Sequence, residues 1–270
     1  CGRILESSTD AEGKEKMNAL TVSNLKKEYP CFHLKEVSFS VGKGRIVGLI
    51  GRNGAGKTTI LKSIMNLISS EGKIEYFGRS LRENEQNIKQ KVGYVSGGFD
   101  FYPLKTLRLI GKTVATFYNN WDERIYREYL ELFSLDENKK VHDLSEGMKV
   151  KFSITLALSR EKNISVLFST HITSDLMRIA DDIIYISDGD ILLECGLKEL
   201  INRYKKVSFR NAEEAKICKF PVFGLKRVKE GYEALVKRED LSHFKGEAKD
   251  VDLDEIIIHL ETEKDKKKCF

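Results

Sequence analysis

The chain of 270 residues contains only 3 prolines and 1 tryptophan, and it has no long apolar run. With 41% hydrophobic and 32% charged residues, this composition excludes collagen-like, mucin-like and wholly disordered chains. The longest apolar runs, such as residues 46–50 and 154–158, fall far short of the roughly 20 residues that span a bilayer. We therefore expect no membrane-spanning helix, and either one large domain or a main domain with a small appendage.

Cysteine pairs of the metal-binding or redox type are also missing. The cysteines are Cys1, Cys31, Cys195, Cys218 and Cys269, with no C-x-x-C spacing among them. This pattern favours structural thiols in a reducing, cytosolic compartment. Residues 1–16 lack the apolar centre of a secretory signal, and Met17 is a candidate natural start. We expect residues 1–16 to be an extraneous or disordered segment.

A strong charge of one sign is absent as well. Lysine and arginine number 46 against 41 aspartates and glutamates, and the excess of +5 is scattered along the chain. Nucleic-acid binding is therefore not indicated.

Short β-rich segments alternate with helical segments from residue 20 to residue 204. Strands are predicted at 20–23, 37–41, 45–50, 73–77, 92–95 and 164–168, and helices at 57–67, 147–160 and 173–180, with two or three more in 105–133. Aromatic residues of the last region, including Phe117, Tyr126 and Phe133, are interpreted as core. An Asp188-Gly189 turn between 183–186 and 191–194 predicts a β-hairpin. The alternation predicts an α/β fold with a mainly parallel sheet.

The motifs stop after residue 204. Segments 207–209, 232–236 and 256–260 are consistent with a small α+β appendage, and the charged run 264–268 is interpreted as a solvated tail. We expect a main domain at 17–204 and the appendage at 205–270.

The strongest chemical signal is a phosphate-binding loop between a predicted strand and a predicted helix. Residues 51–58 read GRNGAGKT, which matches G-x-x-x-x-G-K-[ST]. Glycines let backbone N–H groups surround phosphate oxygens, and the helix directs its positive end at them. Lys57 would reach the β- and γ-phosphates, and the Thr58 hydroxyl would bind Mg²⁺. The candidate nucleotide-binding residues here are Gly51, Arg52, Asn53, Gly54, Ala55, Gly56, Lys57, Thr58 and Thr59.

A second signal, LSEGM at residues 144–148, lies where a helix is predicted to begin. By itself it indicates only that Ser145 is an N-cap, with Met148 and Phe152 on the buried side.

With the phosphate loop, however, the sequence resembles the ATP-binding-cassette (ABC) ATPases over residues 20–204. GRNGAGKTT resembles their Walker A motif, LSEGM their signature, and FSTH at 168–171 their switch-histidine segment. The resemblance implies a P-loop NTPase core with an N-terminal antiparallel β part and a helical subdomain, binding ATP and Mg²⁺. It also implies that Tyr29 stacks on adenine and that His171 senses the γ-phosphate. Ser145 and the Gly147 N–H would contact that phosphate across a head-to-tail dimer.

One element of the family pattern is missing. The family has a hydrophobic strand that ends in Asp-Glu. The Asp helps to hold Mg²⁺, and the Glu polarises the attacking water. No such Walker B element lies between Ser145 and His171, and the gap falls near residues 163–164. We assign 164–168 to the strand before the switch histidine; the alternative is a Walker B strand in which Ser169 and Thr170 replace the acids. Three explanations compete: a genuine deletion, an error in the gene sequence, and a further segment that belongs to a complete protein.

Removal of a central strand leaves its neighbours about 4.8 Å too far apart to bond, unless the sheet closes up. Under a genuine deletion, we predict retained but weakened nucleotide binding with little hydrolysis. Two further departures lower the expected turnover: Gly97 stands at the usual Q-loop glutamine, and Glu146 at a usual signature glycine.

The leading hypothesis is the ATP-binding subunit of a bacterial ABC transporter, held at the cytoplasmic face of the membrane by a separate permease. The LSEGM and FSTHITSDL strings resemble cassettes that export drugs or peptide antibiotics. One alternative is a noncatalytic regulatory cassette that forms a heterodimer with a complete one. Another is a soluble cassette acting on ribosomes or DNA, although only one phosphate loop and no sustained heptads are present.

Overall fold

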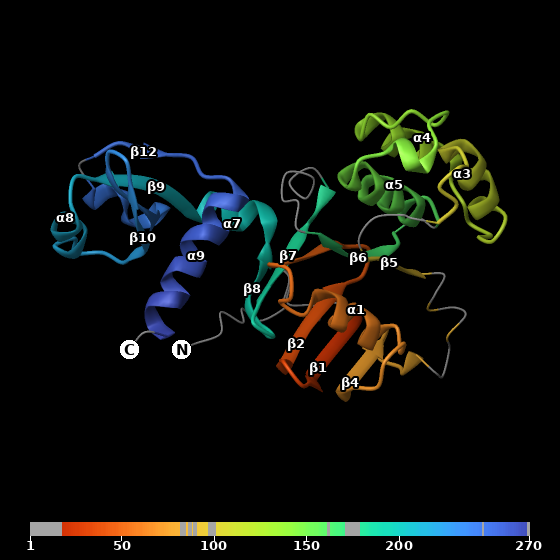
Figure 1. The fold of residues 1–270 in the computed structure, drawn as a ribbon, viewed down its shortest axis with the longest axis horizontal. Coiled ribbons are helices and arrows are strands. Elements are labelled where there is room, and N and C mark those ends of the chain that lie inside the picture. The colour runs from red at the N-terminus through yellow and green to blue at the C-terminus, as the bar shows by residue number, and fades with distance from the viewer. Residues whose placement is uncertain are drawn as a thin grey trace, which may run out of the picture. The chain divides into compact units, whose positions relative to one another are not determined.

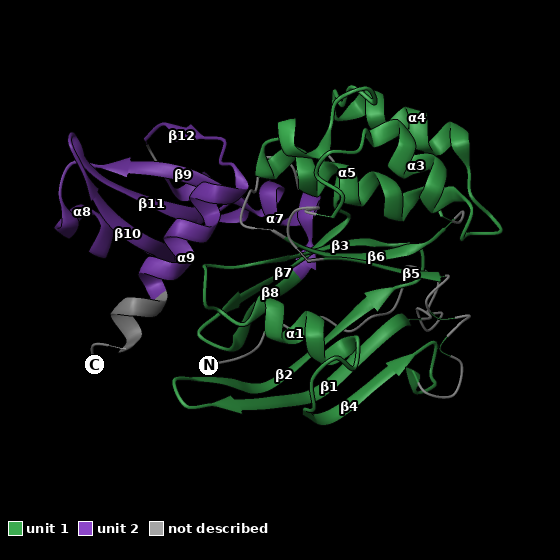
Figure 2. Ribbon diagram, turned by 45° about the vertical axis from the view of Figure 1, so that its right-hand side comes forward, with its two compact units in different colours: residues 1–194 green, residues 195–270 purple. Residues whose placement is uncertain are grey.

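The computed structural model describes residues 18–81, 85, 88, 91–96, 101–160, 163–170, 179–244 and 246–268. The chain divides into two compact units, residues 1–194 and 195–270 (Figure 2). This division falls earlier than the expected boundary at 204, because α7 (Leu197–Arg203) packs on β9 (Tyr204–Phe209) and on η3 (Arg238–His243) of the second unit. The predicted segment 1–16 and most of the predicted helix 173–180 lie outside the described residues.

The first unit is built on a five-stranded, mainly parallel sheet with strand order β5-β6-β3-β7-β8. Its strands are β3 (Ile46–Ile50), β5 (Val92–Ser96), β6 (Ser165–Thr170), β7 (Asp182–Ser187) and β8 (Asp190–Gly196). β3 pairs in parallel with β6 and β7, and β5 pairs in parallel with β6. The predicted α/β class and the predicted β7–β8 hairpin are confirmed. Asp188 and Gly189 have φ values of 52° and 75°, as a tight hairpin turn requires.

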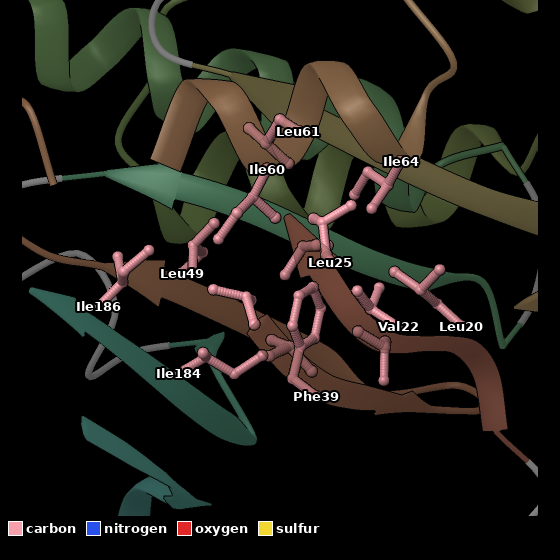
Figure 3. Close-up of a cluster of buried hydrophobic side chains, with 14 of the residues drawn as sticks. Leu20, Val22, Leu25, Phe39, Leu49, Ile60, Leu61, Ile64, Ile184 and Ile186 are labelled. Carbon is pink, nitrogen blue, oxygen red and sulfur yellow. The ribbon is translucent and has the colours of Figure 1, made fainter. Parts of the chain in front are cut away.

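A three-stranded antiparallel sheet and one helix form the layer on one side of that sheet (Figure 1). The antiparallel strands are β1 (Asn18–Tyr29), β2 (Phe32–Gly42) and β4 (Glu71–Tyr76), in the order β2-β1-β4, and the helix is α1 (Lys57–Ile64). Figure 3 shows their apolar side chains pointing toward one another, with Leu61 from α1, Leu25 from β1, Phe39 from β2 and Leu49 from β3. Burial of this shared core holds α1 against both sheets.

On the other face of the five-stranded sheet, α5 (Glu146–Leu158) packs against β5 and β6, and α3 (Leu107–Ala115) and α4 (Glu123–Leu132) pack in turn on α5 (Figure 2). The predictions of helices within 105–133 and at 147–160 are confirmed. Tyr126 and Phe133 are buried as expected. Phe117, however, is 70% exposed, because it follows the end of α3, so its interpretation as core was wrong.

β6 is paired along both edges within the parallel sheet. It pairs with β3 on one edge, Gly48 opposite Phe168, and with β5 on the other, Val95 opposite Phe168. Each buried N–H or C=O left without a partner would cost about 1–3 kcal/mol. The pairing is therefore continuous from β5 through β6 and β3 to β7.

In the second unit, a four-stranded sheet with order β10-β11-β9-β12 packs against α9 (Leu253–Lys268). The remaining elements are α8 (Ala212–Lys216), β10 (Val222–Val228), β11 (Gly231–Lys237) and β12 (Ala248–Lys249). The pairing of β10 with β11 is irregular between Phe223 and Lys226. Two α9 side chains bond the backbone there: His259 Nδ1 donates to the Gly224 carbonyl at 2.7 Å, and the Gly224 N–H donates to Glu263 Oε2 at 3.2 Å.

Within the described part of the chain, no helix has both the length and the apolar character needed to cross a bilayer. In unit 1, η2 (Val141–Asp143) connects the region after α4 to the start of α5.

We predict that the second unit loses stability as the pH falls below about 6.5. His259 is 3% exposed, and its burial lowers the pKa of the imidazole; nearby Lys226 acts in the same direction, while the bond to Gly224 and the charges of Glu233 and Glu255 oppose it. The unfolded chain therefore binds this proton more readily, so acid favours unfolding. Calorimetric unfolding at about pH 5 and pH 7.5 would measure the loss, at about 1.4 kcal/mol for each unit of pKa difference.

His259→Gln removes the titration, so the pH dependence of this transition should diminish. The matched control is His243→Gln, since His243 is exposed in the same unit. An undiminished pH dependence in His259→Gln would contradict the assignment to His259.

Candidate nucleotide-binding site

The loop of residues 51–56 connects β3 to α1 and is shaped by its glycines. Gly51 and Gly54 have φ values of 157° and 81°. A Cβ on Gly51 would lie 2.2 Å from the Ile186 carbonyl oxygen of β7, whereas a Cβ on Gly54 would meet no atom within 4 Å. Gly51 therefore lets the chain turn directly against β7, and Gly54 supplies only a backbone conformation that favours glycine.

The start of α1 presents unpaired backbone donors next to this loop. The first intrahelical bond runs from the Ile60 N–H to the Gly56 carbonyl at 2.9 Å. The amides of the residues from Gly56 to Thr59 precede it and have no acceptor within the helix. Together with the helix dipole, these amides form an anion-binding arrangement.

Lys57 folds over the loop from the first turn of α1. Its Nζ donates to the carbonyl oxygens of Gly51 and Arg52 at 2.6 and 2.8 Å. Partial burial lowers the pKa of the Lys57 ammonium group. An anion beside Nζ would offset this cost of burial, which makes phosphate a suitable ligand.

The β1–β2 hairpin brings one aromatic side chain, that of Phe32, next to the phosphate loop. Tyr29 pairs with Phe32 across the hairpin and is 39% exposed, with the Lys27 ammonium 5.6 Å from its ring centroid. A Cβ on Gly56 would lie 2.7 Å from Phe32 Cζ and 2.7 Å from Leu34 Cδ2. The sequence reasoning missed Phe32; the signal was an aromatic residue directly after the Pro30-Cys31 turn.

The strand next to β3, which we assigned to the segment before the switch histidine, ends in two residues with hydroxyl side chains. Ser169 and Thr170 end β6 and pair with Leu49 and Ile50, directly before the loop. Within the described ranges, no group of three or more His, Cys, Asp or Glu residues could hold a metal ion. The exposed Thr58 is the oxygen donor in the first turn of α1, so Mg²⁺ would be held by Thr58 and the phosphate oxygens of a bound nucleotide.

Ser145 is the N-cap of α5, as predicted, and its Oγ accepts from the Met148 N–H at 3.3 Å. Gly147 lies in the first turn of the same helix. Glu146 is exposed, and its Oε1 accepts from Lys149 at 2.7 Å, so this carboxylate is paired within α5. α5 and α1 lie on opposite sides of the five-stranded sheet (Figure 2). His171 and Gly97 lie outside the described residues.

A parallel sheet, a glycine loop at the end of its central strand and a lysine in the following helix define the P-loop class of nucleotide-binding α/β domains. Comparison with known proteins places the chain within this class. The family model described as "ABC transporter" matches residues 34–167, which assigns this segment to that family. The predicted resemblance to ABC ATPases is thereby confirmed, and with it the role of ATP-binding subunit; proteins of this family bind and hydrolyse ATP.

Two of the similar curated proteins are named for transport. The ABC transporter ATP-binding protein YtrB of Bacillus subtilis is 26% identical over 206 residues, covering 64% of this chain and 70% of that protein. The bacitracin transport ATP-binding protein BcrA of Enterococcus faecalis is 27% identical over 238 residues, which cover 74% of this chain and 76% of that protein.

Solved structures support the fold. The structure of an ATP-binding subunit of an ABC transporter matches with a TM-score of 0.50 at 25% identity, covering 68% of this chain and 92% of that one. The structure of a dimeric, post-hydrolysis ATP-binding cassette, MJ0796 with ADP and Pi, matches with a TM-score of 0.50 at 21% identity. The match covers 66% of this chain and 98% of that one.

We predict that alanine at the two loop glycines has unequal costs. Gly54→Ala should lower the free energy of unfolding by about 1 kcal/mol through backbone strain alone. Gly51→Ala should cost about 3 kcal/mol or more, since its Cβ also collides with the Ile186 carbonyl. Urea unfolding of both variants measures the difference, and equal costs would contradict the close packing of Gly51 on β7.

Proposed function

We propose that the chain is the ATP-binding subunit of a transporter whose membrane-spanning permease is a separate polypeptide. MgATP binds at residues 51–59, with Lys57 at the β- and γ-phosphates, the Thr58 hydroxyl on Mg²⁺ and Tyr29 against adenine. Ser145 and Gly147 of a second cassette close over the γ-phosphate, and His171 senses it. The complex works at the cytoplasmic face of the membrane.

The single observation that supports nucleotide binding most strongly is the position of Lys57. Its ammonium lies within 2.8 Å of two loop carbonyls, next to the amides that begin α1. Backbone N–H donors and one ammonium group together suit a polyphosphate, because all of them are attracted to its negative oxygen atoms.

The names of relatives support a role in transport. BcrA of Enterococcus faecalis is named for bacitracin transport, and the matching region covers 74% of this chain. We propose export of a drug or an antimicrobial peptide, with the cargo selected by the permease.

A second candidate function is that of a noncatalytic cassette that forms a heterodimer with a complete one. The end of β6 supports it, since Ser169 and Thr170 stand beside β3 without an Asp-Glu pair. Such a chain would bind ATP and supply its signature to the partner's nucleotide. ATPase activity that rises on mixing with a complete cassette, and depends on Ser145, would favour this function over a self-sufficient enzyme.

We predict that Lys57→Met weakens MgATP binding about ten- to hundredfold. A hydrogen bond to a charged group contributes about 1.5–3 kcal/mol, and 1.4 kcal/mol corresponds to a factor of ten. Titration calorimetry measures the dissociation constant. Lys62→Met is the matched control, because Lys62 is exposed in the last turn of the same helix and should leave affinity unchanged. Equal affinities in all three chains would overturn the site.

We also predict that this chain alone hydrolyses ATP slowly while still binding it. The backbone and Lys57 suffice for binding, but no acid pair at the end of β6 polarises the attacking water. The rate of phosphate release by the unaltered chain, measured with saturating MgATP, should be close to the rate of the Lys57→Met variant. Rapid, Mg²⁺-dependent release that is lost in Lys57→Met would show that another group replaces the acids.

A further inference from the structure

The turn between β7 and β8 is bonded directly to the phosphate loop. The Gly189 N–H donates to the Ala55 carbonyl at 3.1 Å, and the Gly189 carbonyl accepts from the Lys35 N–H of β2 at 2.8 Å. One residue of the hairpin thus joins the phosphate loop to the antiparallel sheet.

Only glycine fits this position. Gly189 has a φ of 75°, and a Cβ on it would lie 1.8 Å from the His33 carbonyl oxygen. Such close approach to backbone cannot be relieved by a side-chain movement. The turn is therefore held between β2 and the loop, and its N–H has a defined direction.

That direction determines how the peptide between Ala55 and Gly56 is oriented. In a planar trans peptide, the C=O and the following N–H point in opposite directions. Because the Ala55 carbonyl points to Gly189, the Gly56 N–H points away from the turn. Gly56 is the N-cap of α1, so this N–H belongs to the donors at the helix start.

The peptide needs an external restraint. Gly56 has a φ of 112°, a conformation reached mainly by residues without Cβ, and glycine can adopt many others. A flipped peptide would turn the Ala55 carbonyl toward the anion and lose one donor. The bond from Gly189 favours the orientation that suits phosphate.

We propose that Gly189 is a positioning residue for polyphosphate binding: its N–H holds the Ala55–Gly56 peptide so that the Gly56 N–H faces the phosphate groups. The inference rests on the proposed nucleotide site and adds to it a residue from outside the loop. Gly189 acts through Ala55 and makes no contact with the ligand itself.

The test replaces Gly189 by glycolic acid, which changes the amide between Asp188 and Gly189 to an ester and so removes the 189 N–H. The Gly189 carbonyl stays an amide carbonyl, so its bond from Lys35 is kept. We expect the dissociation constants for MgATP and for inorganic tripolyphosphate to rise about tenfold, as for one lost bond to a charged ligand. Adenosine, which has no phosphate, should bind as before.

The matched control is an ester at residue 166, made with 2-hydroxyisovaleric acid. It removes the Val166 N–H, which donates to the Arg45 carbonyl at 3.0 Å at the other end of β6. This ester should lower stability without changing either phosphate-ligand affinity. Equal weakening by both esters, or unchanged tripolyphosphate affinity in the ester at 189, would overturn the role of Gly189.

A second measurement uses the unaltered chain, and it applies even if the ester at 189 does not fold. If the loop must be held in this orientation to bind, then tripolyphosphate must in turn strengthen the Gly189–Ala55 bond. Hydrogen exchange at the Gly189 amide should slow about tenfold on saturation, and unchanged exchange would refute the coupling. If the unaltered chain binds neither tripolyphosphate nor MgATP, the proposed function itself fails, which is a separate result.

Discussion

The parallel pairing of β6 with both β3 and β5 is the constraint on which the first unit depends. Strands pair only at a spacing of about 4.8 Å, so an unfilled position between β3 and β5 would leave buried backbone groups on both without partners. β6 fills that position along its whole length. It thereby fixes the end of β3, from which the phosphate loop begins.

Binding and hydrolysis depend on different parts of this arrangement. In the proposed site, backbone amides and Lys57 would face phosphate, while Gly189 bonds to Ala55 and Phe32 and Leu34 lie against Gly56. Hydrolysis of phosphate esters by such domains also uses side-chain carboxylates, and β6, which pairs with β3, ends in Ser169 and Thr170. A chain can therefore keep the first function after losing the second.

The sequence predicted those features that depend on neighbours along the chain. Periodicity located the strands and helices of the first unit, and local rules identified Ser145 as an N-cap and Asp188-Gly189 as a hairpin turn. Contacts between distant segments could not be predicted, because strand order and register are decided by tertiary packing. The double pairing of β6, the contact of Phe32 with Gly56 and the bond from Gly189 to Ala55 are of this kind. Phe117 shows a different kind of error. Its spacing along a predicted helix indicated a core position, but α3 ends before this residue, and the side chain is exposed.

The irregularity at Gly224 has a consequence for solubility. β10 is an edge strand, and an edge with free peptide groups can recruit a strand from another molecule and so begin aggregation. At Gly224 the N–H and the carbonyl are both engaged by side chains of α9, and the irregular register interrupts the ladder. Helix α9 thus protects the edge of its own sheet against intermolecular β-pairing.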